Sequence, residues 1–151
     1  MFWRILSTVF LAAVLVPQAA CSDTDRKAEL ESITVYKSPT CGCCTKWVNH
    51  LQANGFEVET IDLQDMNPVK VEAGISRQLA SCHTAKTGGY VIEGHVPADD
   101  IKRLLKERPD VAGLTVPGMP MGSPGMEGNR KDNYDVLTFT KTGETTVFSS
   151  H

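Results

Sequence analysis

The sequence predicts an α/β fold in which helices flank a mixed β-sheet. Residues 33–36 and 56–61 alternate apolar and polar side chains, which is typical of strands. A helical pattern separates them, so they form a βαβ unit whose two strands run parallel. Residues 90–93 predict another strand, and residues 135–140 and 145–148 predict a hairpin around a Thr-Gly turn. Strands in both orientations, interleaved with helices, indicate a mixed sheet with helices on both faces.

The first predicted helix covers residues 45–54. Trp47, Val48 and Leu51 share one face of this helix and are expected to be buried against the sheet. An Asn-Gly pair follows the last helical turn and is a typical helix end. The helix therefore starts close to a cluster of cysteines that precedes it.

Two further helices are predicted to begin at prolines. The second begins at residues 67–68, with Asn as the cap and Pro at the first position, is broken at Gly74 and resumes over residues 75–79. The third begins at Pro97 and ends before Pro109, with acidic residues in its first turn and basic residues near its end, as the helix dipole favours. Its buried stripe consists of Ile101, Leu104 and Leu105.

The N-terminus has the pattern of an export signal. Residues 1–20 form a secretory signal whose apolar stretch, 5–16, is too short to span a bilayer. The Ala-Ala-Cys run that ends at Cys21 resembles a bacterial lipoprotein signal, and ordinary cleavage before Cys21 is the alternative. Residues 21–32 are a polar tether, and residues 33–151 are one domain. We expect a periplasmic protein that is either soluble or anchored to a membrane by a lipid on Cys21.

The charge of the chain excludes one class of partner. The formal net charge is −3, and removal of the signal takes away one arginine and no acidic residue, which changes the charge to −4. An acidic chain without a basic tail is not suited to nucleic acid. We therefore expect no nucleic-acid partner.

Three of the five cysteines, Cys41, Cys43 and Cys44, lie within four residues. They follow a predicted strand and precede a predicted helix, so they lie at a helix N-terminus. Unpaired N–H groups and the helix dipole favour an anion there, and the thiolate is both the nucleophile and the metal ligand. The Cys-x-x-Cys spacing of Cys41 and Cys44, at the first helix of such a sheet, is the thioredoxin pattern.

The thioredoxin analogy extends to a proline loop. In thioredoxin-like folds a cis-proline loop precedes the hairpin and packs against the Cys-x-x-Cys pair, and Val116-Pro117 has that place in this chain. The analogy predicts a cis peptide bond at Pro117. It also predicts that Met119, Met121 and Met126 come near the cysteines.

Two chemistries compete for the cysteine cluster. Cys41 and Cys44 alone would serve thiol–disulfide exchange, which makes a periplasmic oxidoreductase the alternative function. Cys43 is superfluous for that reaction, whereas three thiolates so close together suit a soft metal, with Cu(I) favoured and Zn(II) as a competitor. Cys43 as a small buried residue is the structural alternative. We therefore predict a copper-binding protein, and the alternative is an enzyme, either a copper-dependent or a dithiol oxidoreductase.

Further soft donors occur later in the chain. Cys82-His83 adds a thiol and an imidazole, unless Cys82 forms a disulfide with the cluster. Met119 and Met126 lie in a Gly/Pro-rich loop and can ligate Cu(I), with gap filling against the sheet as the alternative. Zinc would use Cys-x-x-Cys with Cys82 and His83, but it has no use for the methionines.

The remaining histidines divide. His95 lies between a strand and a helix, where it could face a site or bond locally, so its role stays open. His50 shares the helix face of Cys43 but lies about 10 Å along the axis at 1.5 Å per residue, which is too far for a shared metal.

Four blocks of this sequence resemble the CopG family of bacterial periplasmic copper-resistance proteins. They are VYKSPTCGCC at 35–44, SCHT at 81–84, GYVIEGHVP at 89–97 and PGMPMGSPGME at 117–127. The resemblance covers nearly all of residues 33–148. It implies a thioredoxin-like fold with an inserted βα unit before the C-terminal hairpin, several Cu(I) ions held as a cysteine-bridged cluster, and a role in copper tolerance that includes copper redox handling.

The resemblance also implies the ligands and the partners. The ligands carried over by the motifs are Cys41, Cys43, Cys44, Cys82 and His83, with Met119 and Met126 of the methionine loop as further donors. The partners are copper ions and other periplasmic copper-handling proteins. A lipid anchor at Cys21 is not needed by the family.

Overall fold

The computed structural model describes residues 32–151. The predicted signal at 1–20, Cys21 and the rest of the tether up to residue 31 lie outside the described residues. Within the described part, no helix is long and apolar enough to cross a membrane.

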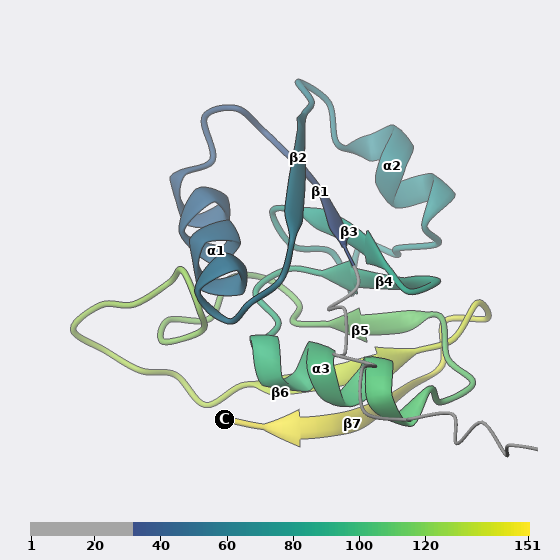
Figure 1. Ribbon diagram of the computed structural model, residues 1–151. Helices are drawn as coiled ribbons and strands as arrows, with labels where there is room; N and C mark the ends of the chain where they lie inside the picture. Colours follow the sequence, from purple (N-terminus) through teal and green to yellow (C-terminus); the bar gives the residue numbers. More distant parts are fainter. Residues whose placement is uncertain (1–31) are drawn as a thin grey trace, which may run out of the picture.

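The described residues form one seven-stranded mixed sheet with the strand order β2-β1-β3-β4-β5-β6-β7 (Figure 1). The strands are β1 (Ile33–Lys37), β2 (Val58–Asp62), β3 (Thr84–Thr87), β4 (Tyr90–Glu93), β5 (Gly113–Thr115), β6 (Asp135–Phe139) and β7 (Thr145–Ser150). β1 pairs with β2 in parallel and with β3 antiparallel, and β4 pairs with β5 in parallel. The predicted mixed sheet, its parallel first pair and its C-terminal hairpin are confirmed.

Helices cover both faces of the sheet. On one face, α1 (Gly42–Ala53) and α3 (Ala98–Glu107) pack against the main hydrophobic core, which contains Trp47 and Leu51 as predicted. α2 (Asn67–Glu72) reaches the other face, because its Lys70 bonds to Glu93 while the neighbouring Ile92 points into the core. In Figure 1, α1 and α3 lie apart from α2, which stands beyond β3 and β4.

Several predicted elements differ in their bounds. The first helix begins at Gly42 rather than at residue 45, so Cys43 and Cys44 belong to its first turn. Met66 is the N-cap of α2 rather than Asn67, and the helix does not resume after Gly74, where the chain makes turns. Strands β3 and β5 were not predicted, since a Thr-Ala-Lys-Thr segment and a three-residue segment carry little periodic signal.

The predicted cis bond before Pro117 is wrong. Every peptide bond in residues 32–151 is trans, including Val116–Pro117. Val116 instead continues the backbone pairing of β5, because its N–H donates to the Glu93 carbonyl at 3.0 Å. The thioredoxin-like description therefore stays a prediction.

Candidate metal centre

The first part of the site is the start of α1. Cys41 is the N-cap residue, and its Sγ accepts a hydrogen bond from the backbone N–H of Cys44 at 3.3 Å. Cys41 and Cys44 form a disulfide with a Cα–Cα separation of 5.3 Å. Within the described chain, Cys43 and Cys82 are not disulfide-bonded, so the predicted alternative of a disulfide from Cys82 to the cluster is wrong.

Cys82 brings the second part of the site to the first. Because β1 and β3 are antiparallel neighbours, the C-terminal end of β1 and the N-terminal end of β3 lie at the same end of the sheet. The Sγ of Cys82 lies 3.5 Å from the Sγ of Cys44, and the Sγ of Cys43 lies 3.5 Å from that of Cys41. The four sulfur atoms all lie within 4.8 Å of one another. Four sulfurs at this spacing can hold a metal.

Two histidines extend the donor set around Cys82. The Nε2 of His95 lies 3.1 Å from the Cys82 Sγ, and the Nδ1 of His83 lies 3.3 Å from it. The three donor atoms lie within 4.8 Å of one another, and both histidines are fully buried. The structure thus answers the open question about His95: it faces the site rather than bonding only locally.

The two imidazoles are held in different ways. The Nδ1 of His95 donates to the Pro124 carbonyl at 2.7 Å, which leaves Nε2 with a lone pair directed at Cys82. The ring of His83 packs against Trp47 with ring centroids 4.3 Å apart. Its Nε2 is buried and has no hydrogen-bond partner within residues 32–151. A buried polar atom of this kind is costly unless something completes its bonding.

Burial shifts the pKa values of three donors, Cys82, His83 and His95, in the direction that favours their neutral forms. It raises the pKa of the Cys82 thiol to about 12, and the nearby Cys43 adds to the effect. Burial lowers the pKa of His95, and it lowers that of His83 well below the usual value, with His95 and Lys70 pushing in the same direction. Neutral imidazoles are the form that binds metals, whereas the Cys82 proton must leave when a metal binds.

The buried ion pair of Glu93 and Lys70 holds the Cys82-His83 segment in place through hydrogen bonds. Glu93 is fully buried, and its carboxylate accepts hydrogen bonds from the Lys70 ammonium at 2.5 Å, the Ser81 N–H at 2.6 Å and the Thr84 hydroxyl at 2.7 Å. Ser81 and Thr84 are the residues on either side of Cys82 and His83. Glu93 therefore fixes the segment at both ends.

The methionine loop touches both halves of the centre. Gly118 donates its N–H to the Ala80 carbonyl at 3.1 Å and accepts from the Ser81 hydroxyl. Gly125 lies against the first turns of α1, where a Cβ would come within 2.7 Å of the Cys43 carbonyl. Met119 and Met126 directly follow these two glycines. The backbone of the loop therefore lies beside both halves of the centre, while the approach of the methionine side chains to the cysteines and their ligand roles stay predictions.

Met119 and His50 have contrasting places. Met119 is 52% exposed, which makes it one of the large apolar residues at the surface of the described chain. His50 lies outside both donor groups, and its Nε2 accepts the backbone N–H of Ala98 at 3.1 Å at the start of α3. His50 therefore has a local role at the start of α3, and its exclusion from a shared metal stays a prediction.

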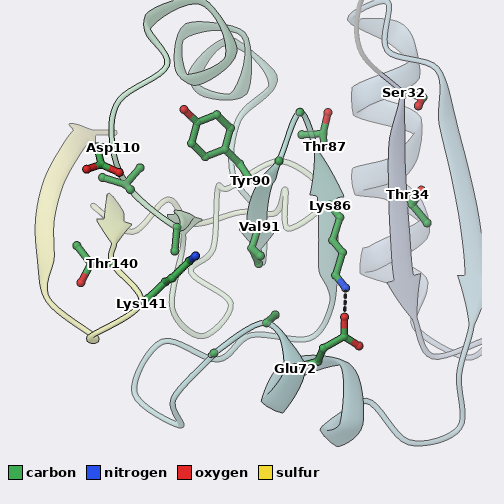
Figure 2. A pocket seen from close by; sticks show the side chains of 16 residues that line it. Ser32, Thr34, Glu72, Lys86, Thr87, Tyr90, Val91, Asp110, Thr140 and Lys141 are labelled. Atoms are coloured by element: carbon green, nitrogen blue, oxygen red, sulfur yellow. Dashed lines mark hydrogen bonds and ion pairs between the residues drawn. The ribbon is translucent and has the colours of Figure 1, made fainter.

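An open cavity of about 900 Å³ lies at the opposite end of the sheet (Figure 2). Its lining includes Thr34 near the start of β1, Tyr90 at the start of β4, and Lys86, whose ammonium bonds to Glu72 at 2.7 Å. Among residues 32–151, no cysteine or histidine lines it. The candidate metal centre is therefore separate from this cavity.

Two solved structures are similar to the chain over most of its length. One, named "Copper resistance protein copG- Form 2", is 46% identical with a TM-score of 0.77, and the alignment covers 82% of this chain and 99% of that one. The chain belongs to the CopG family. The second CopG structure, "Copper resistance protein copG- Form 1", is also 46% identical, with a TM-score of 0.75 and coverage of 80% and 96%.

One further comparison marks a part of the chain. Residues 79–126 match the family described as "Protein of unknown function, DUF411". This stretch contains Cys82, His83 and His95 together with the methionine loop, but it does not contain the cysteines of α1. No curated protein matches the chain. The predicted CopG resemblance is thus confirmed by the structures, with a metal-capable cysteine cluster in this member.

Sequence reasoning missed or left open three residues of this centre. His95 was left undecided, because only the β3–β4 pairing brings its strand end beside Cys82. Glu93 and Lys70 were not singled out, since each looks like a solvated charge in its own element. The signal in the sequence was a single acid, Glu93, in an otherwise apolar strand, together with a base, Lys70, in a predicted helix.

Proposed function

We propose that this protein binds copper as Cu(I) in the periplasm, within a cysteine-bridged cluster of more than one ion, and so contributes to copper tolerance. The observation that carries the proposal is the meeting of four sulfur atoms within 4.8 Å of one another. Thiolate sulfur is a soft ligand and favours soft metal ions such as Cu(I). Bridging thiolates allow several copper ions to share few ligands. The name of the similar CopG structures supports copper as the metal.

The donor set fits soft copper better than zinc. A structural zinc ion uses four ligands in a tetrahedron and leaves none over. Here four sulfurs and two imidazoles converge, and a methionine loop packs beside them. The excess of soft donors favours a cluster.

Copper binding by all four sulfurs requires the reduced form. Reduction of the Cys41–Cys44 disulfide takes two electrons and two protons from a dithiol donor and yields two thiols. Cys41 then lies as the N-cap of α1, where the helix dipole and the Cys44 N–H favour its thiolate. Loss of the thiol protons to solvent accompanies metal binding.

A second candidate function is a thiol–disulfide oxidoreductase that uses Cys41 and Cys44. The disulfide at the start of α1 is the observation that favours it. On that hypothesis Cys43 would be dispensable, whereas the copper proposal requires its sulfur. The two functions therefore differ in what the loss of Cys43 does.

The deciding experiment is Cys43→Ser, with copper per folded chain measured by elemental analysis after anaerobic loading with Cu(I). We expect fewer copper ions per chain and weaker retention against a Cu(I) chelator, because one bridging thiolate is lost. Circular dichroism checks the fold, and Asn49→Ser on the exposed side of the same helix is the matched control. Unchanged copper in folded Cys43→Ser, together with disulfide reductase activity on insulin, would establish the oxidoreductase instead.

A further inference from the structure

The disulfide form keeps a complete set of donors at one side of the centre. We infer that, while Cys41 and Cys44 are joined, Cys82, His83 and His95 form a separate site for a single divalent transition-metal ion. This inference rests on the proposed function, since it concerns the same centre in its other oxidation state. It adds a second metal and a second coordination mode to the cluster proposed for the dithiol form.

The spacing of the three donor atoms matches a common ion. With bonds of roughly 2.0–2.3 Å to nitrogen and sulfur, ligand atoms of a tetrahedral ion lie roughly 3.3–3.8 Å apart. The Cys82 Sγ lies 3.1 Å from His95 Nε2 and 3.3 Å from His83 Nδ1. These two distances differ from that range by a few tenths of an ångström at most, and all three donor atoms lie within 4.8 Å of one another, so side-chain torsions can bring them to the spacing of such an ion.

The imidazoles are already oriented for this ion. A ligating histidine usually donates its second ring N–H to a carbonyl or carboxylate, which fixes the tautomer and the ring direction. His95 does so through Pro124, at 2.7 Å. His83 is held by burial and packing against Trp47, with its Nδ1 beside the Cys82 Sγ, while its other ring nitrogen, Nε2, has no hydrogen-bond partner among residues 32–151. The centre is thus organised around Cys82 without any metal present.

The chemistry of the donors differs from that of the four-sulfur set. Disulfide sulfurs are no longer thiolates, so Cys41 and Cys44 no longer supply anionic ligands. The Cys43 Sγ lies within 4.8 Å of the Cys82 Sγ, but it does not belong to the group of mutually close donors that Cys82 forms with His83 and His95. One thiolate with two imidazoles is a borderline donor set, which suits Cu(II), Zn(II) or Co(II) rather than a cluster of Cu(I) ions.

Binding at this site needs no change of oxidation state. A divalent ion displaces the Cys82 thiol proton, which goes to solvent, and forms one metal–sulfur and two metal–nitrogen bonds. The fourth position is filled by water. The oxidation state of the Cys41–Cys44 pair therefore selects both how many ions the centre holds and which class of ion it prefers.

Cobalt(II) is the probe for this site, because it reports tetrahedral geometry and thiolate ligation by absorption and does not oxidise thiols. The full chain in the disulfide form is titrated anaerobically with Co(II). We expect one Co(II) per chain, with a thiolate charge-transfer band. Cys82→Ser should abolish that band, and His95→Ala should weaken binding by more than the roughly 10–100-fold typical of residues that only orient a ligand.

Two variants complete the design. Cys43→Ser should keep the charge-transfer band in the disulfide form although it loses copper in the dithiol form. His50→Ala is the matched histidine control, since His50 lies outside both donor groups, and it should bind Co(II) as the wild type does. Circular dichroism on each variant checks folding.

The outcomes separate the inference from the proposed function. No Co(II) binding by the disulfide form, or a band that disappears with Cys43→Ser, would overturn the inference while Cu(I) loading of the dithiol form still stands. One Co(II) per disulfide chain without any Cu(I) loading of the dithiol form would support the site and refute the cluster.

Discussion

The Glu93 carboxylate accepts the backbone N–H of Ser81 at 2.6 Å, so a side chain of β4 holds the residue that directly precedes Cys82. The other carboxylate oxygen accepts from Thr84, directly after His83. The Lys70 ammonium of α2 completes the network at 2.5 Å from Glu93. Two donors of the proposed metal centre are therefore positioned by a charge on the opposite face of the sheet.

Glu93→Gln should lower Cu(I) affinity roughly 10–100-fold, as loss of residues that orient metal ligands does. The amide keeps the shape of the side chain but leaves the Lys70 charge without its partner, and breaking a buried pair costs about 3–5 kcal/mol of unfolding free energy. Competition with a Cu(I) chelator and urea unfolding measure the two effects. X-ray absorption of the copper form should show reduced nitrogen coordination.

The matched control for Glu93 is Glu72→Gln, since Glu72 is 71% exposed and pairs with Lys86 at 2.7 Å. Exposed ion pairs contribute about 0–1 kcal/mol. Equal effects of the two variants on copper affinity would show that Glu93 does not position the site.

His83→Ala should lower copper affinity, whereas His50→Ala should leave it nearly unchanged. His83 lies 3.3 Å from the Cys82 Sγ, while His50 bonds to the Ala98 N–H at the start of α3. Loss of that hydrogen bond should cost about 1 kcal/mol of stability. Chelator competition and thermal unfolding test the pair, and a large loss of copper affinity in His50→Ala would contradict this assignment.

Gly125→Ala should displace the methionine loop from α1. Gly125 has φ of +87°, and an added Cβ would come within 2.7 Å of the Cys43 carbonyl and 2.9 Å of the Trp47 nitrogen. The left-handed backbone alone costs a non-glycine residue roughly 1–2 kcal/mol. We expect lower stability and faster loss of copper to a chelator. Gly143→Ala, which has a similar φ of +88° but open space around its Cβ, is the control for backbone strain.

The metal-free protein should lose stability as the pH falls below about 6.5. Burial lowers the pKa values of His50, His83 and His95 from 6.5, so the unfolded chain binds more protons than the folded one in this window. Each group then removes up to about 1.4 kcal/mol per pH unit, and the contribution is fully present only above 6.5. Glu93 has the opposite effect on the slope, because its raised pKa makes the folded chain bind more protons than the unfolded chain at this one group.

Urea unfolding between about pH 7.5 and about pH 5.5 measures this slope. His83→Asn should reduce the slope, because one buried neutral imidazole no longer has to gain a proton on unfolding. A slope that His83→Asn leaves unchanged would show that His83 is not the dominant acid-sensitive group.

How far the sequence predicts this structure depends on the kind of signal. Amphipathic spacing placed α1 and α3, and alternation placed β1, β2 and the C-terminal hairpin, because these elements bury one face each. β3 could not be recognised. Thr84–Thr87 is a central strand between β1 and β4, and its sequence carries no apolar alternation. The cysteine part of the candidate metal centre was visible in the local cysteine spacing, while the place of His95 depended on tertiary pairing.

The loop conformation was the least predictable feature. The analogy to a cis proline at Val116–Pro117 failed: that bond is trans, and Val116 itself donates its N–H to the Glu93 carbonyl of β4. Glu93 itself was hidden by its surroundings in the sequence. A carboxylate in a strand reads as solvent-facing until a base from another element is brought against it.

Cys44 and Cys82 are 38 residues apart in the sequence, so an ion that bridges them would cross-link the chain and close a long loop. The closed segment contains β2, which forms the edge of the sheet, together with α2. Closing such a segment removes chain entropy from the opened states, as a disulfide of the same span would. Copper loading should therefore protect this edge from proteases, and the rate of digestion becomes a direct report of occupancy.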